Sequence, residues 1–339
     1  MNRRKERLIT LSFILAIAAP AHQAIGYYKI IDLGTLSGPS SMARSINNHG
    51  QIVGEAYDSS RNQRATLFDP TSGCKNINLG SGLAYSINNY GQIVGTDGRA
   101  ILFDSTGGGH NINLGGVLAD SINDQGQIVG RAGGATLFDP TGGGHNTALS
   151  KFDSTALSIN NLGQIVGDAR DSSGKWRATL FDPTGGGNNI DLGTLGGTWS
   201  SAFSINDLGQ IVGRANDSSG CGRATLFDPT GGGKNIALSG QWSEAWSIND
   251  NGQIVGMAEN RATLFDPSGG ENNIDLNTLI DPRLGWTLTL ASSINDNGWI
   301  VGYGRNPDGY SRAYLLIPEP ASAVIMVLGA TLIASKRRR

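Results

Sequence analysis

One short pattern occurs seven times in this chain and constrains the fold more than any other feature. The pattern is Ser-Ile-Asn, two turn residues and then Gly-Gln-Ile-Val-Gly, with Trp299 in place of the glutamine in the last copy. The copies begin at Ser45, Ser86, Ser121, Ser158, Ser204, Ser247 and Ser293, at intervals of 35 to 46 residues. Self-similarity at this period is typical of solenoids and propellers, so the sequence predicts a repeat architecture.

Each repeat has the pattern of four short β-strands joined by tight turns. None of the segments has a helical period. The strands expected in the fifth repeat are residues 188–193, 201–206, 210–215 and 223–228. The link Asn-Asn/Asp-x-Gly between the second and third strands is typical of a hairpin with a glycine bulge. In this assignment residues 28–34 are the first strand of blade one, and residues 313–317 are the last strand of blade seven.

Alanines at two fixed places in every repeat indicate close approach of neighbouring sheets. One alanine lies four residues before each repeat asparagine, and a second opens each fourth strand. The adjacent Ile and Val of the third strand make both faces of a sheet apolar, so each sheet must be covered on both sides. The predicted fold class is therefore all-β, a seven-bladed β-propeller of four-stranded blades. An open β-solenoid is the alternative, but it needs caps that the sequence does not show.

The two ends of the chain have the composition of targeting segments. A basic stretch at the start is followed by an apolar run from Leu8 to Pro20, which is typical of a secretory signal peptide over residues 1–26. Cleavage after Ala21 and cleavage after Gly26 both fit. An uncleaved membrane anchor is the alternative, although about 13 apolar residues are few for a bilayer span. The repeat domain then occupies residues 27–317.

The last segment, residues 318–339, has three parts in a fixed order. Pro318, Glu319 and Pro320 precede an apolar run, which predicts a transmembrane helix, and the chain ends on Lys336, Arg337, Arg338 and Arg339. An apolar helix of this kind enters the bilayer while the basic cluster stays on the cytoplasmic side. The tripartite tail resembles a PEP-CTERM sorting signal; a plain tail anchor is the alternative. The resemblance implies an exosortase-type sorting enzyme as partner, transient anchoring in the inner membrane, and a final place at the cell surface or outside the cell.

The repeats themselves resemble the extracellular HAF-repeat family of bacterial surface proteins. The matching residues are Ile-Asn-x-x-Gly-Gln-Ile-Val-Gly in six copies and the Asp-Leu-Gly-Thr-Leu segments at Asp32 and Asp191. The His-Ala-Phe triplet that names the family is Arg-Ala-Thr here, for example at Arg177, so any role of that histidine does not transfer. The family implies export and a repeat scaffold, without an established activity.

Charge and motif content exclude several function classes. Residues 27–317 hold 18 Lys and Arg against 26 Asp and Glu, with no basic stripe, which argues against nucleic-acid binding. No histidine spacing fits a metal site, and no phosphate loop or nucleophile elbow occurs, so we expect no metal, no cofactor and no catalytic residues. The turn carboxylates can be explained by turn formation rather than by Ca²⁺ binding, which needs about six to eight oxygens. These residues are Asp124, Asp207, Asp250 and Asp296.

Three tryptophans are the candidate ligand-binding residues. Trp199, Trp242 and Trp286 lie in equivalent links of blades five, six and seven, where they could stack sugar rings or cap the core of their own blade. The sequence favours a non-catalytic surface or matrix protein that binds a polysaccharide or a protein through its loops. A secreted propeller lyase or hydrolase acting on extracellular polysaccharide is the alternative, because propellers host both functions. An enzyme should break the repeat symmetry at channel-facing positions, whereas the variation between copies is expected in the loops.

Overall fold

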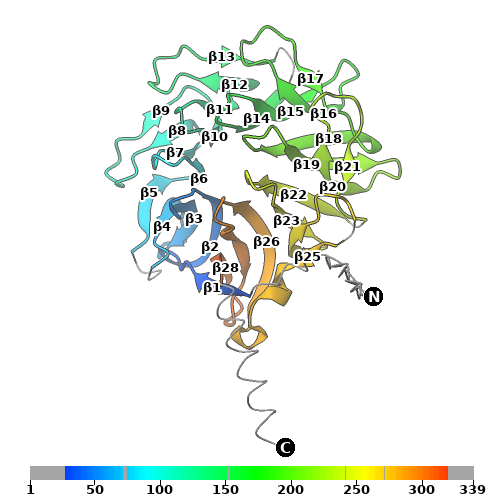
Figure 1. Ribbon diagram of the computed structural model, residues 1–339. Helices are drawn as coiled ribbons and strands as arrows, with labels where there is room; N and C mark the ends of the chain where they lie inside the picture. The colour runs from blue at the N-terminus through cyan, green and yellow to red at the C-terminus, as the bar shows by residue number, and fades with distance from the viewer. Residues whose placement is uncertain (1–26, 72–74, 151–152, 241, 271, 320–339) are drawn as a thin grey trace, which may run out of the picture. The chain divides into compact units, whose positions relative to one another are not determined.

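Seven antiparallel four-stranded sheets are arranged around a central axis (Figure 1). The computed structural model describes residues 27–71, 75–150, 153–240, 242–270 and 272–319. The predicted all-β propeller with seven blades of four strands is confirmed for this part of the chain. The predicted signal peptide and the segment from Pro320 onward, with its basic tail, lie outside the described residues. Within the described residues, no helix is long and apolar enough to cross a membrane.

Each blade has four strands, ordered from the axis outward. The innermost strands are β2 (Ser37–Ile46), β6 (Leu83–Ile87), β10 (Leu118–Ile122), β14 (Ser154–Ile159), β18 (Gly196–Ile205), β22 (Ser243–Ile248) and β26 (Thr287–Ile294). The second strands are β3 (Ile52–Asp58), β7 (Ile93–Thr96), β11 (Ile128–Arg131), β15 (Ile165–Arg170), β19 (Ile211–Asp217), β23 (Ile254–Ala258) and β27 (Ile300–Arg305). The third strands are β4 (Gln63–Phe68), β8 (Ala100–Phe103), β12 (Ala135–Phe138), β16 (Trp176–Phe181), β20 (Gly222–Phe227), β24 (Arg261–Phe265) and β28 (Ser311–Pro318).

The outermost strands are short in most blades. They are β5 (Ile77–Ser81), β9 (Ile112–Asn113), β13 (Thr147–Ala148), β17 (Ile190–Asp191), β21 (Ile236–Ala237), β25 (Ile274–Asp275) and, for blade seven, β1 (Tyr28–Asp32). Two 3₁₀ turns, η1 (Leu276–Leu279) and η2 (Pro282–Leu284), lie between β25 and β26. Pro282 opens η2, and Gly285 ends it in the left-handed conformation that glycine adopts without strain.

The assignment of strands to blades differs from the sequence prediction by one strand. The segment at residues 28–34, expected to open blade one, pairs instead with β28 as the outermost strand of blade seven. Likewise β17, in the segment 188–193, closes blade four rather than opening blade five. The reason is ring closure, since a blade built from both ends of the domain leaves no sheet edge at the junction. Tyr28 pairs with Pro318, so the last strand runs one residue beyond the boundary expected at Ile317.

The apolar cores lie between neighbouring blades, as the invariant alanines predict. Each of the seven clusters of buried side chains combines residues of two adjacent blades. Between blades four and five, for example, Val166 and Ala178 pack with Ala202 and Ile211. All fourteen repeat alanines are fully buried, because a larger side chain would separate the sheets. Every blade is thus covered on both faces by like blades.

Candidate functional site

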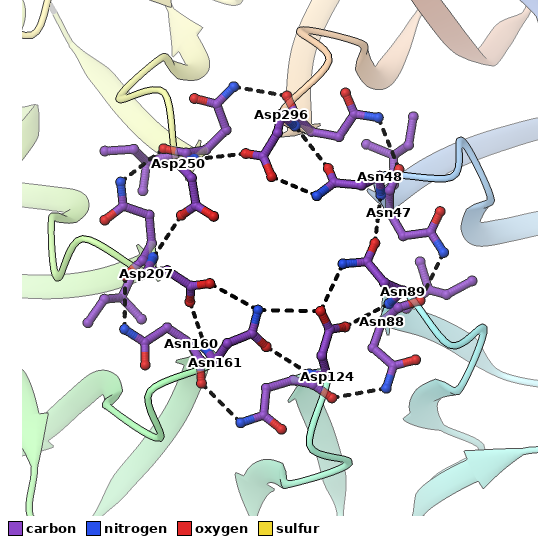
Figure 2. A pocket seen from close by; sticks show the side chains of 18 of the residues that line it. Asn47, Asn48, Asn88, Asn89, Asp124, Asn160, Asn161, Asp207, Asp250 and Asp296 are labelled. Carbon is purple, nitrogen blue, oxygen red and sulfur yellow. Dashed lines mark hydrogen bonds between the residues drawn. The ribbon is translucent and has the colours of Figure 1, made fainter.

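A closed ring of asparagine side chains lies where the innermost strands end (Figure 2). The third residue of each Ser-Ile-Asn pattern donates its Nδ2 hydrogen to the backbone carbonyl of the same asparagine in the next blade, at 2.8 to 3.0 Å. The last bond runs from Asn295 back to Asn47. The same side chain accepts the backbone N–H four residues later, so one amide fixes both its own turn and the next blade. The members are Asn47, Asn88, Asn123, Asn160, Asn206, Asn249 and Asn295.

A second ring follows directly along the chain and explains the turn carboxylates. The next residue in each blade, Asn or Asp, accepts the backbone N–H of its counterpart in the preceding blade at 2.7 to 3.0 Å. Asp124, Asp207, Asp250 and Asp296 are therefore links between blades as well as turn residues, a role that spacing within one repeat did not reveal. Burial raises the pKa of Asp250, and the carboxylates of Asp207 and Asp296 beside it act in the same direction.

These rings enclose a small cavity of about 190 Å³, lined by Asn, Asp and the Ile before each Asn. Most of its polar groups already bind one another across the blade junctions, so its evident role is ring closure. In the part of the chain that the structure describes, no group of three or more His, Cys, Asp or Glu side chains is arranged to hold a metal ion.

A larger cavity of about 450 Å³ lies further along the innermost strands. In every blade the innermost strand has a register shift between the repeat alanine and the repeat serine. A bulge of this kind leaves one residue outside the ladder and redirects its side chain. The seven bulged residues are Arg44, Tyr85, Asp120, Leu157, Phe203, Trp246 and Ser292, and all of them line this cavity. We call the cavity the channel pocket.

The bulged position is where the repeats differ most. It holds seven different residues in seven blades, although the Ala before it and the Ser-Ile-Asn after it are identical in all seven. The expectation that variation lies in the loops is therefore wrong for the channel. The symmetry of the scaffold is broken at a position that lines the channel in all seven blades, which marks the channel pocket as the candidate functional site.

The charged side chains at and beside the channel pocket come mostly from blades one to four. Glu55 binds Arg44 through two hydrogen bonds, one of them 2.9 Å between Nη2 and Oε1, and the guanidinium lies 5.1 Å from the ring centroid of Tyr85. Asp168, next to the pocket, accepts a 2.7 Å hydrogen bond from Ser201 Oγ. Asp120 differs from these groups because its Oδ2 is shielded from solvent and has no hydrogen-bond partner. Burial raises the pKa of Asp120 to about 7, and the negative charge of Asp168 adds to the shift.

The apolar side comes from blades five to seven. Phe203 and Trp246 stack with ring centroids 5.1 Å apart, and Met257, Leu290 and Tyr303 extend this surface. Aromatic faces of this kind take the apolar side of a ligand. Polar groups on one side and aromatic groups on the other are the usual composition of a small-molecule site.

Two of the three predicted tryptophans are connected to this pocket. The guanidinium of Arg214 lies 5.3 Å from the ring centroid of Trp199 and also from that of Trp242. Arg214 donates to Glu244 at 2.7 Å, and Glu244 also accepts a 3.1 Å hydrogen bond from the indole of Trp246. Trp199 and Trp242 thus hold a charged pair behind the aromatic side of the pocket, and each already has a cationic partner for its ring.

The other predicted site residues lie elsewhere. Trp286 is half-buried against the core between blades six and seven, and it takes no part in the group around Arg214. Pro318 is the last residue of β28, and the backbone N–H of Glu319 donates to the carbonyl of Tyr27 at 2.8 Å. The first two residues of the predicted sorting motif therefore belong to the seam that closes the ring, whereas Pro320 and the basic tail are outside the described residues.

This chain is similar to one family model and to two solved structures. Residues 34–143 match a family described as "Protein of unknown function (DUF3466)". No curated protein matches the sequence. The chain is similar to the WD40 β-propeller domain of Doa1, at 13% identity and a TM-score of 0.44, over 84% of this chain and 96% of that chain. It is also similar to the Trypanosoma rangeli sialidase in complex with 2,3-difluorosialic acid, at 10% identity and a TM-score of 0.35, over 85% of this chain and 57% of that chain.

The channel pocket was missed in the sequence analysis, although a signal for it is present. The pattern Ala-x-Ser-Ile-Asn has identical residues on both sides of one freely varying position. Such a position in a repeat has no shared packing role, so its side chain is free to serve a site. What the sequence alone does not give is the bulge, which turns that side chain toward the axis.

Proposed function

We propose that this chain is an exported, non-catalytic binding protein of the cell surface or extracellular matrix, and that its channel pocket holds a saccharide unit of an extracellular polymer. The observation that carries the proposal is the set of seven different side chains at the seven bulged positions of an otherwise uniform ring. A scaffold without a ligand has no need for this variation, because the alanines and asparagines that hold it together are the same in every blade.

The chemistry of the pocket supports a saccharide. Sugar rings present C–H groups on their faces and hydroxyls at their edges, which suits an aromatic surface facing polar side chains. Phe203 and Trp246 supply that surface, while Tyr85, Asp120 and Ser292 supply hydrogen-bonding groups. This proposal moves the ligand from the rim tryptophans to the channel, because Trp199 and Trp242 each have a ring partner in Arg214.

The two terminal segments are the basis for proposing delivery to the cell surface. We infer a signal peptide over residues 1–26 and a sorting signal over residues 318–339 that is recognised by an exosortase-type enzyme. The two segments flank the same place in the ring, because Tyr27 and Glu319 are hydrogen-bonded neighbours. Both processing steps would then act at one seam, on either side of the strand pair β1 and β28. A replacement of Pro318-Glu319-Pro320 by three alanines is expected to leave the protein in the inner membrane, which fractionation of cells would detect.

The binding proposal is tested with a glycan array and the full chain. We expect retention of a defined subset of glycans, and loss of that retention in Trp246→Ala, which removes one ring of the stacked pair. Trp286→Ala is the matched control, because Trp286 packs against a core away from the pocket. Equal retention by the unchanged protein and Trp246→Ala would refute the channel pocket as the binding site.

A second candidate function is polysaccharide cleavage in the same channel, because broken repeat symmetry at channel-facing positions is also what an enzyme would show. Asp120 and Asp168 are both carboxyl groups whose pKa is raised by burial, and the negative charge of Asp168 adds to the upward shift of the Asp120 pKa. Glycoside hydrolysis uses two carboxyl groups with different ionisation states. Incubation with extracellular polysaccharides, followed by measurement of new reducing or unsaturated ends, separates this function from binding. Product that disappears in Asp120→Asn would favour the enzyme.

A further inference from the structure

The unpartnered carboxyl oxygen of Asp120 narrows the chemistry of the ligand. Among the described residues, the other charged groups at the pocket have partners: Arg44 binds Glu55, Asp168 binds Ser201, and Glu244 binds Arg214. Asp120 Oδ2 has none, although water does not reach it. A carboxylate with one shielded oxygen and no donor is costly, so a ligand whose donor reaches the partly exposed side of Asp120 that lines the pocket gains more there than at any satisfied group.

The charges around Asp120 favour a cationic donor. The nearby cations are Arg44 and Arg131, and the nearby anion is Asp168. Arg44 is held by Glu55, and Arg131 Nη2 lies 3.8 Å from Asp153 Oδ1. Arg170 Nε also lies 3.5 Å from Asp153 Oδ2, so this region holds three arginines, Arg44, Arg131 and Arg170, against four carboxyl groups, Glu55, Asp153, Asp120 and Asp168. One carboxyl group is left in excess near the pocket. An ammonium group supplies both the missing charge and the missing hydrogen bond.

The aromatic side of the pocket comes from other blades than this carboxyl group. Asp120 belongs to blade three, whereas Phe203 and Trp246 belong to blades five and six of the seven-membered ring (Figure 1). A ligand that spans the pocket therefore meets a carboxylate at one end and stacked rings at the other. Stacked rings accept the apolar face of a sugar and also favour a nearby positive charge.

We propose that the channel pocket selects an amino sugar with a free ammonium group, which binds Asp120 while the face of the sugar ring packs on Phe203 and Trp246. This inference rests on the proposed saccharide-binding function and adds the charge of the ligand to it. N-acetylation removes the positive charge and enlarges the substituent, so acetylated and neutral sugars should bind more weakly.

The test compares three soluble β-1,4-linked oligosaccharides of equal length: glucosamine, N-acetylglucosamine and glucose. Isothermal titration calorimetry on the full chain at neutral pH is expected to show the glucosamine oligomer binding about tenfold or more tightly than the other two, as for a charge-assisted hydrogen bond. Asp120→Asn should abolish this preference and leave the weaker binding of the other two in place. Asp308→Asn, an exposed carboxylate in blade seven, is the matched control and should change nothing.

The outcomes separate this inference from the function on which it rests. Equal affinity for all three oligomers, lost in Trp246→Ala but unchanged in Asp120→Asn, would overturn the amino-sugar inference and keep saccharide binding. No binding of any oligomer would overturn both. Thermal unfolding of each variant shows whether the fold is intact. Asp120→Glu keeps the negative charge, so it should retain part of the preference for the glucosamine oligomer that Asp120→Asn loses.

Discussion

At the scale of single residues, Asp120 links the stability of the ring to pH. Burial and the charge of Asp168 raise the pKa of Asp120 to about 7, while Arg131 and Arg44 oppose the shift. When the pKa of a carboxyl group is higher in the folded state than in the unfolded state, the group stabilises the folded protein at a pH below the unfolded pKa, near 3.9 for Asp. This stabilisation is lost as the pH rises through the folded-state pKa. The ionised side chain is therefore a cost to the folded state above about pH 7.

Replacing Asp120 by Asn should therefore stabilise the protein, and more so at high pH. Asn resembles the protonated acid in shape but does not ionise. We expect the unfolding temperature of Asp120→Asn to exceed that of the unchanged protein at pH 8, with a smaller difference at pH 5, measured by differential scanning calorimetry. Asp308→Asn serves as the exposed control. A difference that is the same at both pH values would show that Asp120 does not titrate in this range.

The asparagine ring offers a second test at this scale. Asn206 is buried; its Nδ2 donates to the carbonyl of Asn249 at 2.9 Å, and its Oδ1 accepts the N–H of Gln210 at 2.8 Å. Asn206→Ala leaves both backbone groups without this partner and should lower the free energy of unfolding by about 1–3 kcal/mol. Chemical denaturation measures the change. The exposed Asn188→Ala should stay within about 0.5 kcal/mol, and a similar loss in both variants would argue against the ring as a source of stability.

At the scale of the element, the bulge depends on the last glycine of the Gln-Ile-Val-Gly pattern. In blade five, a Cβ on Gly213 would collide with the backbone carbonyl of Ser201 and the Cα of Ala202, both on the neighbouring strand β18. The same collision occurs at this glycine in all seven blades. The glycine is thus required by close approach of two backbones rather than by a positive φ, and it allows the bulge that directs Phe203 to the axis.

Gly213→Ala should consequently damage both stability and the pocket. We expect a loss of about 1–3 kcal/mol from overpacking, together with a change in tryptophan fluorescence as Phe203 moves against Trp246. Gly233→Ala is the matched control, since Gly233 has a positive φ of 77° and open space around its Cα. That control should cost about 1–2 kcal/mol from its backbone conformation and leave the fluorescence unchanged. Unaltered fluorescence in Gly213→Ala would separate the glycine from the pocket.

The turns and the buried alanines of each blade could be predicted from the sequence, whereas the contacts between blades could not, for a physical reason. Turn glycines such as Gly50, with a φ of 77°, and the buried alanines follow from local chemistry and from spacing. The side-chain bonds between blades do not, because Asn206 and Asn249 are 43 residues apart and each also satisfies its own turn. The channel pocket could not be predicted for a similar reason: Asp120 and Trp246 line the same cavity only because two bulges in distant repeats face one axis.

At the scale of the whole molecule, the ring is closed by the first strand of the domain, β1, which completes the last blade. Strand β1 pairs with β28 over five residues, from Tyr28 opposite Pro318 to Asp32 opposite Tyr314. Ile30 packs against the core between blades six and seven, and Ile31 packs against the core between blades seven and one. The sequence contains a signal for this arrangement. The domain begins with an outermost strand, the segment that follows the third strand in every other repeat, and it ends on a third strand that lacks one.

The last repeat departs from the others at the contact between blades seven and one. Trp299 replaces the glutamine of the pattern, and its ring lies against Gly50 of blade one across the closing junction. In the other blades the glutamine at this position lies below the turn glycine of the next blade, as Gln210 does at Gly252. The larger, partly buried apolar side chain adds buried surface between blades seven and one.

Removal of β1 is therefore expected to open the ring at a defined place. A chain that begins at Leu33 exposes the edge of β28, including the buried Leu315 and Leu316, so we expect a lower unfolding midpoint and concentration-dependent association through the free edge. Addition of a peptide with the sequence Tyr28–Asp32 and its flanking residues should restore part of the midpoint by strand addition, whereas a scrambled peptide should not. Denaturation curves and light scattering measure both effects. If the shortened chain unfolds at the same midpoint as the complete one and stays monomeric, closure is held by the asparagine rings alone, and the strand pair at the seam contributes nothing to the stability of the propeller.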